Sequence, residues 1–98
     1  MRSNDKDVVE TMLNICEGYI KIKEIEKCEK VLEEIRSLID ETNIEQVIEQ
    51  NLFWYRAYII KEMQDEAENI LLETFNLAKA NGLYKKMAEL SILLGRYY

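Results

Sequence analysis

One short pattern occurs three times in the chain and limits what it can fold into. Each copy has a large apolar residue, a second residue that is small in two of the copies, and a tyrosine three positions further on. The copies begin at Ile15, Trp54 and Leu94, so 39 and 40 residues separate them. A period of this length is typical of stacked helical hairpins, each of which buries its apolar face on its neighbours. The copies are Ile15-Cys16-x-x-Tyr19, Trp54-Tyr55-x-x-Tyr58 and Leu94-Gly95-x-x-Tyr98.

Each of the first two copies is followed by a matching second segment. A small residue, Cys28 or Ala67, comes nine positions after the tyrosine, and a leucine, Leu32 or Leu71, comes four positions after that. This pattern predicts a single all-α domain of antiparallel helical hairpins, with repeats at about 5–42 and 43–82. The third copy belongs to a half repeat at 83–98.

Apolar residues spaced by three and four positions predict five helices. The chain has no proline and only three glycines, so long helices with very short connections are expected. Asn43 and Gln46 have the spacing of a capping box that opens the third helix, and Asn81-Gly82 is a typical helix stop. We expect helices at 5–21, about 24–39, 44–62, about 65–80 and about 83–98.

Charge and composition argue against several classes of function. The chain of 98 residues has a net charge of −6 and no histidine, which makes nucleic acid an unsuitable partner. No apolar run is long enough to cross a membrane, and the N-terminal residues lack the apolar core of a signal peptide. We therefore expect a cytoplasmic protein without a membrane partner. The commonest general base, histidine, is missing, and two cysteines alone are too few ligands for a zinc site. We therefore expect no enzyme activity, no catalytic residue, no metal and no cofactor.

The paired segments resemble a tetratricopeptide repeat. In that family the first helix carries an aromatic residue, Leu-Gly and Tyr, and the second carries small residues where the two helices cross. This sequence departs from the pattern where Tyr55 stands at a small position and where Lys23 and Glu62 replace the usual turn glycine. Its period also exceeds the usual value of about 34 residues. The resemblance implies a right-handed superhelix of about five helices, or two and a half repeats.

The longer period resembles the repeats of peptide-pheromone-sensing regulators of Gram-positive bacteria, the Rap, PlcR and Rgg group. The runs that carry this resemblance are residues 76–82, NLAKANG, and residues 88–98, AELSILLGRYY. The resemblance implies a sensor fragment of a bacterial regulator, or a stand-alone relative, whose partner is a protein or a short peptide. DNA or a response regulator would be bound by a separate domain.

In such repeats the first helix of each pair lines a concave surface on which peptide ligands lie. Arg56 and Arg96 occupy the same place in successive units, so their guanidinium groups are expected to converge on a peptide carboxylate. Asn14 would hold a peptide backbone through its amide, and Phe53 would project into the groove as an exposed aromatic. The expected groove consists of Asn14, Glu17, Lys21, Phe53, Arg56, Ile60, Glu89 and Arg96. The same faces of these three helices also carry Glu10, Leu13, Glu49, Leu52, Ile92 and Leu93.

Each of these groove assignments has a structural alternative. The arginines would instead form ion pairs with acidic groups on the same surface, and Phe53 would be buried between repeats. The acidic residues that could pair with them are Glu17, Glu49 and Glu89.

Trp54 and the two cysteines fall at predicted contacts between helices. Trp54 is expected in the core, on the buried face of the third helix. Cys16 and Cys28 occupy the small positions where paired helices touch. They fit either reduced buried thiols, acting as small apolar residues, or a disulfide.

The last helix is a poor end for a stack of repeats, which needs a polar outer face. No following helix covers its apolar residues, so we expect them to lie in an interface that gives a homo-oligomer. Alternatively, this helix folds back onto the third and fourth helices. The overall prediction is a non-enzymatic module that binds a protein or peptide, and the alternative is a structural fragment that self-associates without a ligand. The expected interface residues are Leu90, Leu93, Leu94, Tyr97 and Tyr98.

Overall fold

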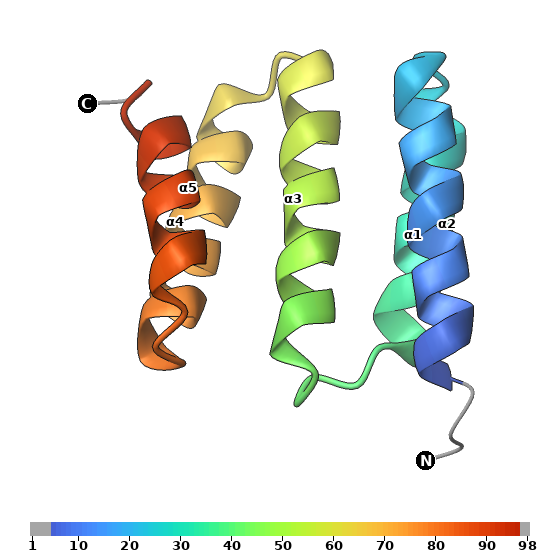
Figure 1. Cartoon of the computed structure of the whole chain (residues 1–98). Helices are drawn as coiled ribbons and strands as arrows, with labels where there is room; N and C mark the ends of the chain where they lie inside the picture. Colours follow the sequence, from blue (N-terminus) through green and yellow to red (C-terminus); the bar gives the residue numbers. More distant parts are fainter. Residues whose placement is uncertain (1–4, 97–98) are drawn as a thin grey trace.

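The computed structural model describes residues 5–96, and this span folds into five α-helices. They are α1 (Asp5–Lys21), α2 (Ile25–Leu38), α3 (Ile44–Ile60), α4 (Gln64–Ala80) and α5 (Tyr84–Leu94). Consecutive helices run antiparallel, and Figure 1 shows α1, α3 and α5 in the nearer layer with α2 and α4 behind them. None of these helices combines the length and the apolar content that crossing a membrane requires. The predicted all-α class is confirmed for this span, and its packing agrees with helical hairpins.

The connections α1–α2, α3–α4 and α4–α5 share one corner geometry. In each, a residue with positive φ follows the first helix: Lys23 at 60°, Glu62 at 60° and Gly82 at 66°. The backbone N–H of the next residue then donates to the carbonyl five positions earlier, as Glu24 does to Tyr19 at 2.9 Å. This arrangement satisfies the last carbonyls of one helix while the next helix begins. The equivalent bonds join Met63 to Tyr58 at 2.8 Å and Leu83 to Ala78 at 3.0 Å.

Lys23 and Glu62 hold a backbone conformation that costs a residue with a Cβ atom about 1–2 kcal/mol. Replacing either residue with glycine is expected to raise the free energy of unfolding by about 0.5–1 kcal/mol, because glycine removes that cost but adds chain entropy to the unfolded state. The two corners share no hydrogen bond, so the gains are expected to add in the double variant. Urea denaturation followed by circular dichroism measures the change. Gly82→Ala is the matched control and should lose stability, whereas unchanged midpoints in both glycine variants would contradict the prediction.

The α2–α3 connection is longer and is built differently. Asp40 accepts two hydrogen bonds from Thr42, one from its N–H at 2.9 Å and one from its hydroxyl at 2.6 Å. Asn43 then caps α3 by accepting the N–H of Gln46 at 3.3 Å, as predicted. The Gln46 side chain donates to the carbonyl of Lys6 at 2.9 Å, rather than back to Asn43 as a capping box would. That bond ties the start of α1 to the start of α3.

Two helices end earlier than the sequence predicts. α3 ends at Ile60, because Glu62 is the positive-φ residue of the corner. α5 ends at Leu94, and Gly95 and Arg96 form a turn. The last two positions of the predicted helix, 97 and 98, lie outside the described residues.

The core consists of two clusters of buried side chains, and Trp54 belongs to the first of them, while Tyr58 and Ile70 pack against both. The first cluster packs α1 against α2 and includes Trp54 of α3, and the second packs α3, α4 and α5 together. Trp54 is 6% exposed, and its ring lies 5.8 Å from that of Tyr58 between centroids. The Arg36 guanidinium lies 5.0 Å from the centroid of the indole ring. The prediction that Trp54 is a core residue is confirmed.

Cys16 and Cys28 are buried, and no disulfide joins them. The Sγ atom of Cys16 lies 4.0 Å from the carbonyl oxygen of Cys28, so the two helices touch at these small residues, as predicted. Burial raises the pKa of the Cys16 thiol to about 12 and also raises the pKa of Cys28. Of the two interpretations, buried thiols that act as small apolar residues describe this structure.

The prediction that the leucines of the last helix are uncovered is wrong for Leu90 and Leu94. Their side chains are 1% and 8% exposed and belong to the cluster between α3, α4 and α5. The tight α4–α5 corner turns α5 back along α4, so this leucine stripe is buried within the chain, in agreement with the alternative. Leu93 is partly buried. Tyr97 and Tyr98 lie outside the described residues.

Candidate peptide-binding surface

The layer formed by α1, α3 and α5 is more open on the α5 side. Among the described helices, no Cα atom of α5 lies within 8 Å of a Cα atom of α3, although α1 and α3 do approach this closely. α5 packs on α4, and Leu90 and Leu94 fill the space beneath it. Two hollows lie along this opening, one toward each end of α3.

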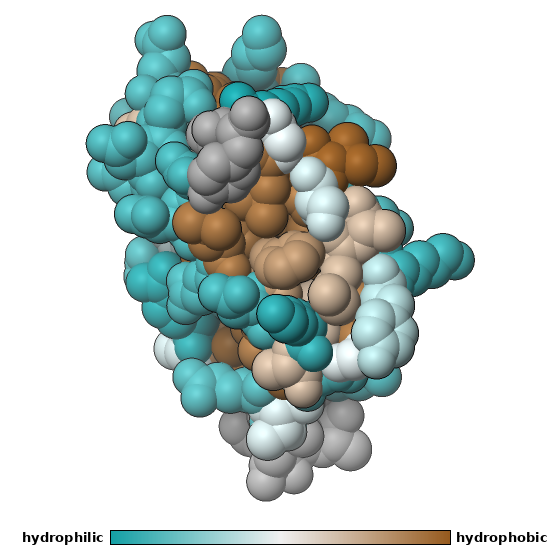
Figure 2. Space-filling model, turned by 90° about the vertical axis from the view of Figure 1, so that its left-hand side faces the viewer, coloured by the Kyte–Doolittle hydropathy of each residue, from teal (hydrophilic) through white to brown (hydrophobic). Residues whose placement is uncertain are grey.

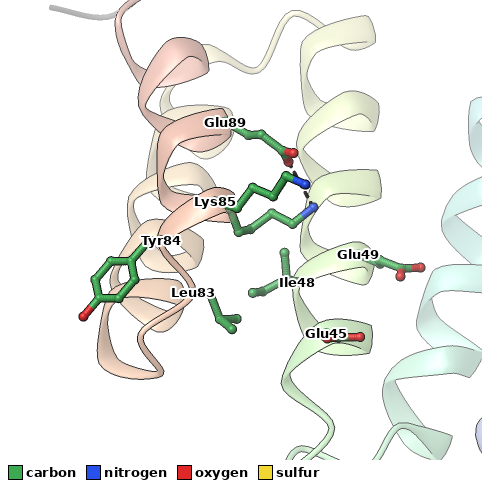
Figure 3. Close-up of a pocket in the computed structure, with 8 residues that line it drawn as sticks. Glu45, Ile48, Glu49, Leu83, Tyr84, Lys85 and Glu89 are labelled. Atoms are coloured by element: carbon green, nitrogen blue, oxygen red, sulfur yellow. Dashed lines mark ion pairs between the residues drawn. The ribbon is translucent and has the colours of Figure 1, made fainter.

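The first hollow has a volume of about 410 Å³ and lies between the start of α3 and the start of α5. Ile48 and Leu83 give it an apolar base (Figure 3). Glu45 and Glu49 border its α3 side, and Figure 3 shows the Glu49 carboxylate pointing away from α5. Neither glutamate has an ion-pair partner among residues 5–96. Both carboxylates are therefore available to a ligand.

The α5 side of this hollow carries both signs of charge. The Nζ atom of Lys86 lies 3.1 Å from Oε2 of Glu89. Glu89 was predicted to line the groove, and its charge is thus balanced by a lysine of the same helix. The side chain of Lys85 reaches toward α3, whereas the ring of Tyr84 points away from the hollow (Figure 3).

A third hollow, of about 300 Å³, lies between α1 and the start of α3. Glu10 and Asn14 line it from α1, and Lys6 stands at its end. Glu45 and Glu49 border this hollow as well as the first one. We refer to Glu10, Glu45 and Glu49 as the acidic edge, because three carboxylates here face one cation.

The hollow at the other end of α3 has a volume of about 220 Å³ and combines cationic and apolar side chains. Arg56 and Arg96, predicted to converge, both line it, and so does Ile60. Arg96 has no ion-pair partner within the described part of the chain. We call this site the arginine hollow; its lining residues are Tyr55, Arg56, Ile59, Ile60 and Arg96.

The sequence did not predict two members of the arginine hollow, Ile59 and Tyr55, and the more unusual of them is Tyr55. Its side chain is 5% exposed, and its hydroxyl is buried without a hydrogen-bond partner among residues 5–96. A buried hydroxyl of this kind costs about 1–3 kcal/mol, and such groups are rare in folded proteins. The available sequence signal was the departure from the repeat pattern, since a large polar aromatic stands where a small residue is usual.

Arg56 is already engaged within the chain. Its Nη1 and Nη2 atoms donate to the two carboxylate oxygens of Glu17 at 3.2 and 2.9 Å, which joins α3 to α1. These hydrogen bonds lower the pKa of Glu17. The guanidinium also lies 5.3 Å from the ring centroid of Phe53, which packs partly buried against the first core cluster. For Arg56 and Phe53 the structural alternatives therefore describe the contacts seen.

The remaining predicted groove residues are scattered. Asn14 and Glu89 lie at the acidic end of the surface. Lys21 is exposed at the end of α1 and lines none of the three hollows. The prediction that Leu13 lies on the groove-lining face of α1 is wrong, because its side chain is buried in the first core cluster.

The fold and this surface define a class: a small all-α protein of stacked helical hairpins with a charged, hollowed face. Comparison of the chain with models of known protein families, with curated proteins and with solved structures gives no match. The chemistry of the surface therefore has to be inferred from its own geometry and charge.

Proposed function

We propose that this chain is a tetratricopeptide-like module, a right-handed superhelix of two and a half repeats, that binds a short peptide and has no enzymatic action. The peptide would lie across α1, α3 and α5. The observation that carries the proposal is the unpaired Arg96 in a hollow that is also lined by Tyr55, whose buried hydroxyl has no hydrogen-bond partner among residues 5–96. A role as the sensor part of a bacterial peptide-responsive regulator agrees with a surface of this kind.

A peptide carboxylate would supply the acceptors that the arginine hollow lacks. Carboxylate oxygens accept paired hydrogen bonds from a guanidinium group and further bonds from a phenol. Arg96 would supply the main charge, because Arg56 already gives two hydrogen bonds to Glu17. Ile59 and Ile60 would cover the apolar part of the terminal residue.

The acidic edge would hold the other end of the peptide. Glu10, Glu45 and Glu49 line the hollow between α1 and α3 with Lys6 as its one cation, and this balance favours an N-terminal amine or a basic side chain there. Eleven positions separate Glu45 from Arg56, which corresponds to about 16 Å along α3. An extended chain rises about 3.3 Å per residue, so about five residues span this distance. The proposed ligand is thus a peptide of about five residues, basic at one end and with a carboxylate at the other.

Selection from a randomised library of peptides of about four to eight residues tests this proposal. The selected peptides are expected to carry a free carboxylate or an acidic residue at one end and Lys, Arg or a free amine at the other. Arg96→Ala should weaken the best peptide about tenfold or more, measured by calorimetry, because a charge-assisted pair is lost. Amidating the peptide carboxylate should have a similar effect.

The matched control is Lys27→Ala, which removes an exposed cation from the outer face of α2. It should leave peptide affinity unchanged. If no library peptide binds more tightly than about 1 mM, peptide binding by this surface is excluded. If Arg96→Ala and the control bind the selected peptide equally, the arginine hollow is not its carboxylate site.

A further inference from the structure

The ion pair between Glu17 and Arg56 places a carboxylate of the chain itself beside the proposed peptide site. Arg56 lines the arginine hollow together with Arg96, and its Nη1 and Nη2 atoms donate to the two carboxylate oxygens of Glu17 at 3.2 and 2.9 Å. A peptide carboxylate would bind a free guanidinium group with the same paired geometry. Glu17 therefore holds Arg56 in the way that the end of a peptide would.

Glu17 opposes the binding of a second carboxylate to Arg56 in two ways. It engages both Nη atoms of the guanidinium group, whose carbon atom also lies 5.3 Å from the ring centroid of Phe53. Its negative charge balances that of Arg56 and would stand close to an incoming carboxylate. Like charges at such short range repel one another more strongly at a protein surface than in bulk water. A peptide carboxylate therefore gains little from Arg56 until Glu17 leaves.

The surroundings of Glu17 allow it to leave. The side chains of Arg56 and Glu17 are 40% and 39% exposed, and ion pairs with this much exposure contribute little to stability. Lys21 is exposed and follows Glu17 by four positions on the same face of α1, a favourable spacing for an ion pair. The hydrogen bonds from Arg56 lower the pKa of Glu17, and the charges of Arg56 and Lys21 lower it further. Glu17 can thus pass from Arg56 to Lys21 without losing a cationic partner.

We propose that Glu17 is an internal competitor for the peptide carboxylate at Arg56, and that peptide binding transfers Glu17 to Lys21. This inference rests on the proposed function, because it assigns the regulation of the same surface. Arg56 would then join Arg96 on the peptide. The transfer removes the ion pair that joins α1 to α3. Because coupling between two binding events is reciprocal, the peptide weakens this tie by the same factor by which Glu17 weakens the peptide.

The exchange would leave the far end of the stack unchanged. α3, α4 and α5 are packed together by the apolar side chains of the second core cluster, and Leu72 and Phe75 of α4 pack partly buried against it. Figure 2 views the surface at this end and shows apolar side chains gathered at its centre with polar side chains around them. Contacts between apolar side chains do not depend on which cation pairs with Glu17. The amide resonances of Leu72 and Phe75 therefore provide an internal reference for NMR spectra of the complex.

Calorimetric titration of the full chain with the peptide Lys-Ala-Ala-Ala-Leu tests this inference. The peptide has a basic end, a free carboxylate and an apolar terminal side chain for Ile59 and Ile60. Glu17→Gln should bind it about fivefold more tightly than the wild type, because Arg56 is then free for the peptide carboxylate. The gain should vanish with the C-terminal amide of the same peptide. It should also vanish when Arg56→Ala is added to both chains.

Glu29→Gln is the matched control. Glu29 pairs with Lys61 at 3.0 Å, so this variant also removes an ion pair between the first hairpin and the end of α3, but neither residue lines the arginine hollow. Its affinity for the peptide should equal that of the wild type. Lys21→Gln should weaken binding about twofold in the wild type and not in Glu17→Gln, because only a charged Glu17 needs the second cation.

NMR titration of the Glu17 carboxyl carbon gives a second measurement. Saturation with the peptide should raise the pKa of Glu17 toward its ordinary value, because the hydrogen bonds from Arg56 that lower this pKa are lost. The resonances of Leu72 and Phe75 should keep their positions. A pKa of Glu17 that stays the same on saturation would overturn the transfer.

The binding results separate this inference from the proposed function. If Glu17→Gln binds the peptide as the wild type does, or more weakly, Glu17 is no competitor, and the peptide surface stands without it. An equal effect of Lys21→Gln in both chains would remove Lys21 as the second partner and so overturn the transfer. If neither chain binds the peptide more tightly than about 1 mM, the peptide surface fails, and this inference fails with it.

Discussion

Replacing Trp54 with alanine is expected to lower the free energy of unfolding by about 3–5 kcal/mol. The indole is buried, stacks on Tyr58 and belongs to the cluster that holds α1 and α2 on α3. Its removal leaves a cavity in the first core cluster beside Tyr58. Domains of this size are stable by about 5–15 kcal/mol, so the variant should be close to unfolding. Urea denaturation followed by far-ultraviolet circular dichroism measures the loss.

Trp54→Phe is the control that keeps an aromatic ring at this position. It should lose less than about 1.5 kcal/mol, because most of the buried volume remains and the indole N–H, which is buried without a partner among the described residues, is removed. A loss below about 1 kcal/mol in Trp54→Ala would show that the packing of the first core cluster does not depend on this side chain.

Tyr55→Phe is expected to raise the free energy of unfolding by about 1–3 kcal/mol. The substitution keeps the buried ring and removes a hydroxyl that has no hydrogen-bond partner within residues 5–96. If the hydroxyl donates to a peptide carboxylate, as proposed, the same variant should bind the selected peptide about fivefold or more weakly. Greater stability together with weaker binding is the pattern expected of a residue retained for function.

Tyr58→Phe is the control for the hydroxyl, since Tyr58 is only partly buried in the same helix. It should change stability by less than about 0.5 kcal/mol. A Tyr55→Phe variant that loses stability would show that the hydroxyl is satisfied in solution. A variant that gains stability but binds the peptide with unchanged affinity would show that the unpartnered hydroxyl takes no part in peptide binding.

Five helices and most of their boundaries could be predicted from the sequence, because these depend on local chemistry, whereas α3 and α5 end earlier than predicted. The repeat at Ile15 and Trp54 gave the register of α1 and α3, and Asn81-Gly82 gave the end of α4. The burial of Leu90 and Leu94 could not be predicted in the same way. A helix that is apolar on more than one face can bury any of these faces. The direction of the α4–α5 corner decides which face of α5 packs inward.

The candidate site was predictable in its charges but not in its contacts. Equivalent positions in successive repeats brought Arg56 and Arg96 to one hollow. The ion pair between Arg56 and Glu17 depends on the distance between α1 and α3, and the opening beside α5 depends on its distance from α3. Neither distance is encoded in one helix. Tyr55 was visible only as an exception to the repeat, because a missing hydrogen bond is a property of the assembled structure.

The shared corner geometry has a consequence for how the chain reaches its folded state. Each corner is closed by hydrogen bonds that span five residues or fewer, and each helix touches only helices that are one or two places away along the described chain. Little loop-closure entropy is therefore lost before the first favourable contacts form. Folding can begin at any of the three corners and spread to its neighbours, so this topology belongs with those that fold rapidly.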